Sequence, residues 1–304
     1  MRSLYDTGGA WYKGNLHTHT TRSDGRLPAG EAIGFYREAG YDFIALTDHW
    51  RQSEPLEEPG FLQLAGCEFD TGNMTDLVRQ PVFHIVGVGM ERAVALPKAH
   101  DHPPQVLIDA IREAGGLAIL AHPAWSLTDP ALVPPLSGLS AAEIFNTFSG
   151  LPHSNARPES SLYFDIWALQ GFLLPCTAAD DCHWYEGEQG RSFMMVNASA
   201  LTAQAIRAAI AAGNFYASQG PRFEQIRYDG ETVEISCSEV QTVIFYSNTL
   251  YSADRLTLAE SGGTVTAARY AVKPSDRYIR VELIDREGRH AWSAPFAAEK
   301  TRNR

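Results

Sequence analysis

Two histidines one residue apart, His17 and His19, are the first residues in the chain whose types and spacing could do chemistry. They end an extended run, and the two-residue period of a strand places both imidazoles on one face. Two imidazoles so placed can chelate one metal ion, but they can equally be two polar residues at a strand end. The pair alone leaves both interpretations open.

Further imidazoles and carboxylates occur along the chain, most of them near the ends of apolar runs. They are Asp24, His49, Glu68, His84, His122, Asp181 and His183. Imidazole and carboxylate groups are suited to zinc, manganese and iron, and the full set of nine exceeds what one ion can take. A structural role explains any one of these histidines, but not all of them together. The set therefore predicts two to three divalent metal ions (Mn, Zn or Fe) bridged by a carboxylate.

Seven apolar runs before about residue 200 have the pattern of buried strands, and most end in a polar or ionisable residue. They cover residues 11–19, 42–49, 61–69, 81–89, 116–123, 141–146 and 172–183. Amphipathic helices are predicted over residues 28–40, 103–116 and 202–213. Alternating strands and helices predict an α/β fold with a parallel sheet, and polar groups at so many strand ends favour a (β/α) barrel over a doubly wound sheet.

The pattern changes from about Pro221 onward. Apolar and polar residues alternate, turn signals such as Asp229-Gly230 recur, and no helix pattern intervenes. The sequence therefore predicts two domains, a barrel over residues 1–220 and a small C-terminal antiparallel β-sandwich-like domain over residues 221–304.

The composition argues against several classes of function. Lys and Arg number 25 against 36 Asp and Glu, which gives a formal net charge of −11, and no basic stripe occurs. Proteins that bind nucleic acid through its phosphates usually carry a basic surplus. No run of about 18 apolar residues is present to span a membrane, and the first residues lack the apolar core of a signal peptide. We expect a cytoplasmic protein without membrane contact or stable nucleic-acid binding.

The motifs together resemble those of a known family. Residues 14–50, with His-Thr-His, Ser-Asp-Gly and Thr-Asp-His, resemble the opening of the PHP (polymerase and histidinol phosphatase) superfamily, and Ala121-His122-Pro123 and Asp181-Cys182-His183 match its later motifs. The resemblance covers roughly residues 12–220. It implies a distorted (β/α)7 TIM-like barrel with a trinuclear metal centre. The segment Ala-Trp-Ser-Ala-Pro near the C-terminus resembles the carbaryl-hydrolase-like branch, although Ala294 stands where that branch usually has Asn.

The resemblance also implies how the nine residues divide among three ions. The first ion takes His17, His19, Glu68 and Asp181; the second takes Glu68, His84 and His122; the third takes Asp24, His49 and His183. Glu68, Asp181 and His183 are thereby the predicted catalytic residues.

Adjacent ions of this kind lower the pKa of a shared water and polarise the group under attack. A phosphate monoester or cyclic diester of a small molecule or nucleotide has several anionic oxygens and suits such a centre best. We expect a phosphoesterase in which a metal-bound hydroxide attacks phosphorus in line. The negative net charge does not oppose this, because the charge of the ions dominates the field inside the site.

Phosphate oxygens that no ion holds need donors from the protein. Arg191, Arg157 and His153 lie in loops after predicted strands, and Asn146 ends one of these strands. These four are the predicted substrate contacts. A solvated surface position explains Arg191 equally well, and Asn146 can also serve only to cap its loop.

Two other functions fit the same motifs. An ester, carbamate or amide hydrolase would use the same metal centre on another bond, and a non-catalytic metal-binding interaction module would keep the fold without turnover. Degenerate modules lose ligands, and none is lost here. An amidohydrolase with a carbamylated lysine is excluded, because only Lys98 occurs between Lys13 and Lys273 and it lies on no predicted strand.

Several neighbouring residues are assigned to other roles. Asp48 and Asp180 precede candidate ligands and would face away from them, so we expect them to support ligands rather than to bind metal. His100 and His102 repeat the His-x-His spacing without a preceding strand and are predicted to be surface residues. Four aromatic residues can wall a pocket or belong to the core: Trp125, Phe145, Phe148 and Trp184.

Overall fold

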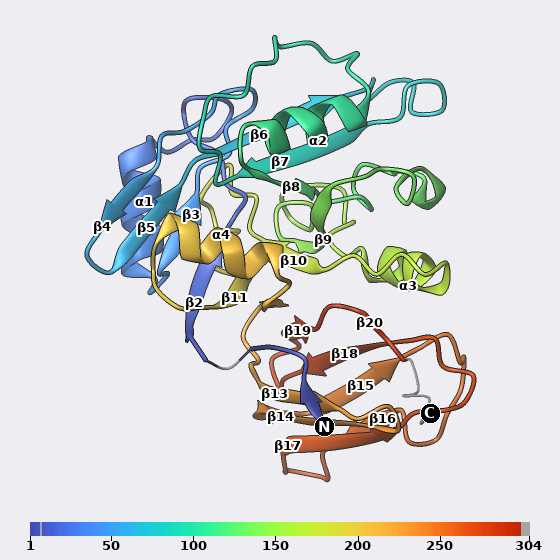
Figure 1. The fold of residues 1–304 in the computed structure, drawn as a ribbon. Coiled ribbons are helices and arrows are strands. Elements are labelled where there is room, and N and C mark those ends of the chain that lie inside the picture. Colours follow the sequence, from blue (N-terminus) through green and yellow to red (C-terminus); the bar gives the residue numbers. More distant parts are fainter. Residues whose placement is uncertain (7, 299–304) are drawn as a thin grey trace.

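The computed structural model describes residues 1–6 and 8–298, which form a mixed α/β part and an all-β part (Figure 1). The helices of these residues are α1 (Ala29–Glu38), α2 (Pro104–Glu113), α3 (Ser161–Leu169) and α4 (Ala203–Ala211), with a 3-10 turn at Pro130–Leu132. No helix in the described part of the chain is long and apolar enough to cross a membrane.

Local sequence explains where the predicted helices begin and end. Pro104 is the first residue of α2, where its missing N–H and fixed φ are tolerated, and Gly115 adopts a φ of +85° just after the helix. The side chain of Thr202 caps α4 by accepting a hydrogen bond from the backbone N–H of Ala205 over 3.2 Å. The helix α3 was not predicted.

A five-stranded sheet forms one side of the mixed part. Its order is β10 (Cys176–Ala179), β9 (Leu139–Asn146), β8 (Leu117–Leu120), β7 (Phe83–Val88) and β6 (Gly66–Thr71). Strands β8, β9 and β10 are parallel, but β7 is antiparallel to both β6 and β8. The prediction of a parallel sheet is therefore wrong at β7. The cause is the connection over residues 72–82, which contains no helix and returns the chain directly beside β6.

A second sheet runs through both parts of the molecule. Its order is β16 (Leu256–Leu258), β15 (Thr242–Tyr246), β18 (Tyr278–Ile284), β19 (His290–Trp292), β12 (Phe215–Ser218), β11 (Phe193–Ala198), β2 (Ala10–Asn15), β3 (Phe43–Ala45), β5 (Phe61–Leu64) and β4 (Leu56–Glu58), and β20 (Phe296–Ala297) pairs with β18. The strand predicted over residues 61–69 is divided between the two sheets as β5 and β6. Gly66 permits this division, since a Cβ there would lie 2.5 Å from the carbonyl oxygen of Leu46.

The two sheets meet at two seams just beyond the ends of β2 and β3. An isolated parallel bridge joins Thr18 to Cys182, and another joins His49 to Glu68. Single bridges, rather than continuous ladders, link the sheets because the strands on either side are short. The described residues thus have a mixed α/β architecture without a closed barrel, and of the distorted (β/α)7 barrel that the resemblance implies, the α/β class is confirmed.

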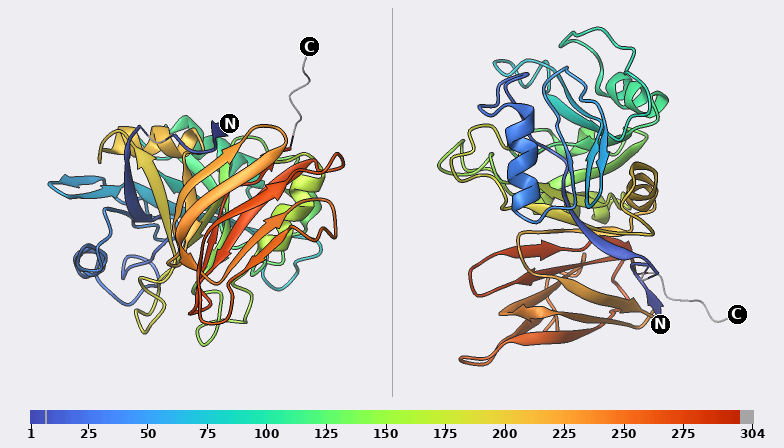
Figure 2. Two further views of the ribbon diagram at one scale, coloured as in Figure 1. Left: turned by 90° about the horizontal axis from the view of Figure 1, so that it is seen from below. Right: turned by 90° about the vertical axis from the view of Figure 1, so that its left-hand side faces the viewer.

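The all-β part packs two antiparallel layers against each other (Figure 2). One layer has the order β1 (Arg2–Ser3), β13 (Phe223–Tyr228), β14 (Thr232–Val240) and β17 (Val265–Ala271). The other is the end of the long sheet that contains β15 and β18. Strand β1 comes from the N-terminus, so this part of the molecule includes residues from both ends of the chain (Figure 1). The domain boundary at residue 220 stays a prediction.

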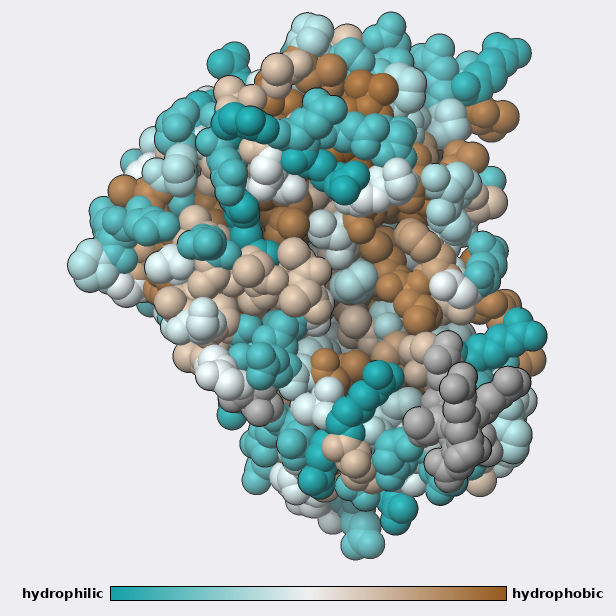
Figure 3. Space-filling view, viewed as in Figure 1, coloured by the Kyte–Doolittle hydropathy of each residue, from teal (hydrophilic) through white to brown (hydrophobic). Residues whose placement is uncertain are grey.

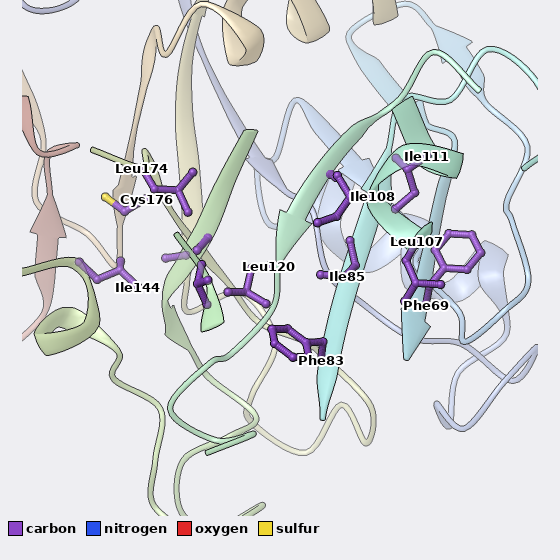
Figure 4. Packing of buried hydrophobic residues seen from close by; sticks show 14 of the residues in the cluster. Phe69, Phe83, Ile85, Leu107, Ile108, Ile111, Leu120, Ile144, Leu174 and Cys176 are labelled. Atoms are coloured by element: carbon purple, nitrogen blue, oxygen red, sulfur yellow. The ribbon is translucent and has the colours of Figure 1, made fainter. Parts of the chain in front are cut away.

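Apolar side chains of α2 pack on the five-stranded sheet. Leu107, Ile108 and Ile111 are fully buried and lie beside Ile85 of β7 (Figure 4). Burial of these apolar side chains stabilises the contact between α2 and one face of the sheet. The outside of the molecule is mostly hydrophilic in the view of Figure 3, with small hydrophobic patches over the mixed part.

Arg280 of β18 joins the two parts of the molecule. Its side chain is fully buried, and it donates to Asp165 of α3 through Nη2 over 2.8 Å and through Nε over 3.2 Å. Nη1 donates to Glu282 over 3.3 Å, and the guanidinium carbon lies 4.1 Å from the ring centre of Tyr246. A buried, paired guanidinium thus links α3 to the all-β part.

Candidate metal centre

The seams bring the nine candidate ligands together. Hydrogen bonds between the backbones of the two sheets set their positions: the N–H of Asp181 donates to the carbonyl of His17 over 2.9 Å, and the N–H of Glu68 donates to that of Thr47 over 3.1 Å. The ligands lie beyond β2 (His17, His19), β3 (His49), β8 (His122) and β10 (Asp181, His183), within β6 (Glu68) and β7 (His84), and in the turn that holds Asp24.

Four buried residues form the tightest group: His17, His19, Glu68 and Asp181. Nε2 of His17 lies 3.2 Å from Oε2 of Glu68 and 3.1 Å from Oδ1 of Asp181. Nε2 of His19 lies 3.1 Å from each of the same two oxygens. These are the four residues that the resemblance assigns to the first ion.

Two further groups adjoin the first and share members with it. One contains His49, Glu68 and His84, and the other contains His19, Asp24, His49 and His183. This division differs in part from the one that the resemblance implies, because His49 belongs to both groups and His122 to neither. Nε2 of His122 lies 3.5 Å from Oε1 of Glu68 and 3.9 Å from Oδ2 of Asp181. Glu68 therefore lies at the centre of the whole cluster.

The residues present fit divalent cations. Oδ1 of Asp181 and Nδ1 of His49 are buried and make no well-aligned hydrogen bond with the described residues, although oppositely charged groups lie 3.1 Å and 3.4 Å from them. A buried polar atom without a partner costs about 1–3 kcal/mol, so such atoms are rare unless an ion or water satisfies them. The combination of imidazole and carboxylate donors is also the one that zinc, manganese and iron take.

Charges within the cluster set the protonation of its members. Burial on its own would lower the pKa of His17, but the carboxylates of Asp181 and Glu68 outweigh burial and raise it. Burial would raise the pKa of Glu68, but the positive charges of His17, His49 and His84 hold it well below its usual range. The pKa of Asp181 is lowered against burial in the same way by His17. The carboxylates are thus ionised at neutral pH, which is the form that binds metal.

The backbone is strained at three positions around the cluster. Trp50, His122 and Asp181 adopt positive φ values of 53°, 27° and 53°. Non-glycine residues in this region occur mostly where neighbouring structure holds them, and such strain is often found at functional sites. At Asp181 the bond to the carbonyl of His17 holds the strained backbone in place.

Glu143 of β9 orients one candidate ligand, His17, through the ring nitrogen that faces away from the cluster. Its Oε1 lies 2.8 Å from Nδ1 of His17, and its Oε2 accepts from the backbone N–H of His122 over 2.9 Å and from Nδ2 of Asn146 over 2.8 Å. A carboxylate on Nδ1 fixes the tautomer and orientation in which Nε2 faces the cluster. Sequence reasoning missed Glu143, although an acidic residue inside the apolar run of residues 141–146 is a usable signal.

Replacing Glu143 by Gln is expected to weaken metal binding and catalysis by about 10–100-fold. The Gln side chain has the same shape as Glu, but its NH2 group would face one of the three groups that now donate to Glu143, namely His17, the His122 N–H or Asn146. Metal affinity by chelator competition and kcat measure the effect. The matched control is Glu159→Gln, since the Glu159 side chain is exposed and accepts from the hydroxyl of Ser161 rather than from a candidate ligand. Equal behaviour of the two variants would contradict the role of Glu143.

Asp48 and Asp180 support the cluster without belonging to any of its groups, as their spacing predicts. Asp48 accepts from the backbone N–H of Thr20 over 2.8 Å and from the hydroxyl of Ser23 over 2.9 Å. Asp180 accepts from the Tyr36 hydroxyl over 2.8 Å and from three successive N–H groups of residues 190–192. Burial raises the pKa of Asp180 to about 6 even though these hydrogen bonds lower it.

The cluster forms the floor of an open cavity of about 530 Å³. Aromatic side chains form part of its wall: the ring of Phe148 stacks on His183 at 4.2 Å between centres, and that of Trp125 meets His122 edge-on at 4.9 Å. The remaining lining residues are Asp24, His49, Glu68, Asp70, Met74, His84, Lys98, His100, Ser149, Asp181 and Trp184. A ligand in this cavity can therefore contact the candidate metal ligands and aromatic surface at once.

Comparison with known proteins bears on the fold. No family model and no curated protein matches the sequence. Among solved structures, the chain is similar to a two-domain protein from Bacteroides vulgatus that contains a predicted PHP-like metal-dependent phosphoesterase, with a TM-score of 0.50 and 14% identity over 98% of this chain and 97% of the other. The two chains therefore share a fold. The likeness extends over the all-β part as well.

Two further solved structures are more distant. The lesion-specific endonuclease EndoQ from Pyrococcus furiosus has a TM-score of 0.46 and 13% identity over 67% of this chain and 56% of the other. An amidohydrolase from Chromobacterium violaceum has a TM-score of 0.42 and 16% identity over 58% of this chain and 89% of the other. Structural similarities with TM-scores this low give no information about function.

The predicted substrate contacts do not line the cavity above the cluster. Asn146 is fully buried, and its amide donates to Glu143 and, over 3.2 Å, to Asp181. His153 stacks on the far side of Phe148 at 5.8 Å, while the side chains of Arg157 and Arg191 are exposed. Asn146 thus orients a candidate ligand, and a role in substrate binding stays a prediction for all four.

The two histidines predicted to lie on the surface differ in their surroundings. His102 contacts the carbonyl of Pro97 through Nε2 over 3.0 Å and does not line the cavity above the cluster. His100 does line that cavity and pairs with Asp70. His100 is exposed, as predicted, but it also lies at the rim of that cavity, because the loop of residues 89–103 folds back beside β6.

Proposed function

We propose that this protein is a metal-dependent hydrolase, specifically a phosphoesterase that cleaves a monoester or cyclic diester of a small molecule or nucleotide. The observation that carries the proposal is the cluster itself, in which two of the three groups of candidate ligands share Glu68 and the buried Oδ1 of Asp181 accepts no well-aligned hydrogen bond from the described residues. Adjacent cation positions around one shared carboxylate suit a substrate group that has several anionic oxygens. The PHP fold supports the same reaction class.

Two to three divalent ions would be held by the nine residues of the cluster. Divalent ions in such a site supply an activated water near neutral pH and polarise phosphoryl oxygens. We also propose that β2, β3 and β6 to β10 function as a distorted (β/α)7 barrel. The two seam bridges support this, since they link the strands at the points where the ligands lie.

The chain's own residues orient the ligands and shape the space above them. Glu143 holds His17, and Asn146 holds Asp181, so both ligands keep one orientation before substrate arrives. Phe148 and Trp125 offer flat apolar surface at the wall, which suits a substrate with a ring next to its phosphate and displaces water from it.

Solvent labelled with oxygen-18 is expected to deliver one labelled oxygen to phosphate in a single turnover. The protein would be prepared separately with Mn, Zn or Fe and given a panel of phosphate monoesters and cyclic diesters, with mass spectrometry of both products. Label found only in the alcohol would contradict attack on phosphorus. Metal-loaded protein that cleaves aryl carbamates or esters but no phosphoester would instead establish the alternative, an ester, carbamate or amide hydrolase.

The segment that resembles the carbaryl-hydrolase-like branch does not favour that alternative. Trp292 is fully buried, stacks on Phe145 at 5.7 Å between ring centres, and does not line the cavity. The segment thus belongs to the contact between the two parts of the molecule rather than to the substrate site.

A further inference from the structure

A second pair of imidazole and carboxylate lies at the rim of the cavity, outside the nine candidate ligands. The pair is His100, in the loop of residues 89–103, and Asp70, in β6. Nδ1 of His100 lies 2.5 Å from Oδ2 of Asp70, and both residues line the cavity.

The loop is fixed where it meets β6. The hydroxyl of Thr71 donates to the carbonyls of His100 over 3.1 Å and of His102 over 2.5 Å, and the N–H of Gly72 donates to that of His100 over 2.8 Å. Asp70 is itself held, because Oδ1 accepts from the indole N–H of Trp50 over 2.9 Å. The imidazole of His100 is therefore a positioned group rather than a freely moving surface side chain.

The pairing leaves one ring nitrogen of His100 for a ligand. Nδ1 faces the carboxylate, and no other hydrogen bond of the described residues engages Nε2. The side chain is 52% exposed, so the ring can exchange protons with water. A carboxylate on Nδ1 fixes the orientation of the ring and leaves Nε2 facing the cavity side, as it does in other pairs of His and carboxylate.

The other ionisable groups of the cavity are poorly suited to give up a proton. Seven of the lining residues are candidate metal ligands, which leaves Asp70, Lys98 and His100. Asp70 is engaged by Trp50 and His100, and Nδ1 of His49 lies 3.4 Å from its Oδ1. Among side chains in general, imidazole is the one that both carries and releases a proton near neutral pH.

We propose that His100 is the general acid that protonates the leaving oxygen, with Asp70 as its positioning residue; this rests on the proposed phosphoesterase function. As the bond from phosphorus to the leaving oxygen breaks, its electron pair goes to that oxygen, which takes the proton from Nε2. Water supplies the new oxygen on phosphorus and releases one proton to solvent, and His100 regains a proton from solvent. The sum is ester plus water giving alcohol plus phosphate.

The test compares two substrates of nearly the same shape, phenyl phosphate and p-nitrophenyl phosphate. p-Nitrophenolate leaves readily as an anion, whereas phenolate depends more on protonation. His100→Gln is expected to lower kcat/KM about 100-fold for phenyl phosphate and less than about fivefold for p-nitrophenyl phosphate. Metal content and the affinity for inorganic phosphate, measured by calorimetry, should be unchanged. The matched control, His102→Gln, should behave as the wild type with both esters.

The other outcomes distinguish a failure of the general-acid role of His100 from a failure of the phosphoesterase function. Wild-type protein that hydrolyses both esters, with His100→Gln slowing them equally or not at all, would overturn the general acid and leave the phosphoesterase standing. Loss of bound metal in His100→Gln would also overturn it, since His100 would then act as a ligand. Metal-loaded wild-type protein that cleaves neither ester while it cleaves carbamates would overturn the proposed function, and the inference with it.

Discussion

Glu68→Gln is expected to lower both metal content and phosphoester hydrolysis, the latter by more than about 100-fold. The substitution keeps the size of the side chain but removes the charge that the clustered histidines share. Oε2 of Glu68 lies within 3.4 Å of ring nitrogens of His17, His19 and His49, and Oε1 lies 2.7 Å from Nδ1 of His84. Substitution of residues that hydrogen-bond to metal ligands typically lowers metal affinity or activity about 10–100-fold. Loss of a ligand that two groups share should therefore exceed that range.

Elemental analysis of purified protein and steady-state rates with defined ions measure this effect. Glu38→Gln, at the exposed end of α1, is the matched control and should change neither quantity. A Glu68→Gln variant with wild-type metal content and rate would show that the cluster is not a metal centre.

Asp165→Ala is expected to destabilise the protein by roughly 3 kcal/mol, because it leaves the fully buried Arg280 without its closest partner. Glu282 still contacts Arg280 over 3.3 Å, which keeps the loss at the lower end of the usual range for broken buried pairs. Chemical denaturation followed by tryptophan fluorescence measures the shift in the unfolding midpoint.

The control for this pair is Glu234→Ala. Glu234 and Arg227 form an ion pair at 3.4 Å on the surface of the all-β part, where such pairs contribute about 0–1 kcal/mol. Equal destabilisation by the two variants would mean that Arg280 does not join the parts as we describe.

Most of the candidate ligands could be predicted because they follow, or lie in, a short apolar run of the sequence; Asp24, in a turn, is the exception. His17, His49 and His122 come directly after strands, so their meeting required only that strand ends converge. The groups they form were less predictable. His49 is a member of two groups and His122 of none, since membership depends on side-chain orientation beyond the strand ends.

Other features depend on contacts that no local pattern reveals. The antiparallel course of β7 follows from a loop without a helix, and the helix α3 carries apolar residues on several sides, so it lacks the one-sided stripe that predicts a surface helix. His100 reaches the cavity only because its loop is bonded to Thr71 and Gly72, far from it in sequence. The predicted substrate contacts rested on loop position alone, and loops are the part of a fold that strand patterns constrain least.

The pairing of β1 with β13 has a consequence for how the molecule is made. Ser3 pairs with Arg227, so β1 cannot find its neighbour until β13 has been synthesised. Pairings between such distant residues form slowly and late. The strands and helices of the mixed part that lie between β1 and β13 can thus assemble on the nascent chain before β1 finds its place in the all-β part.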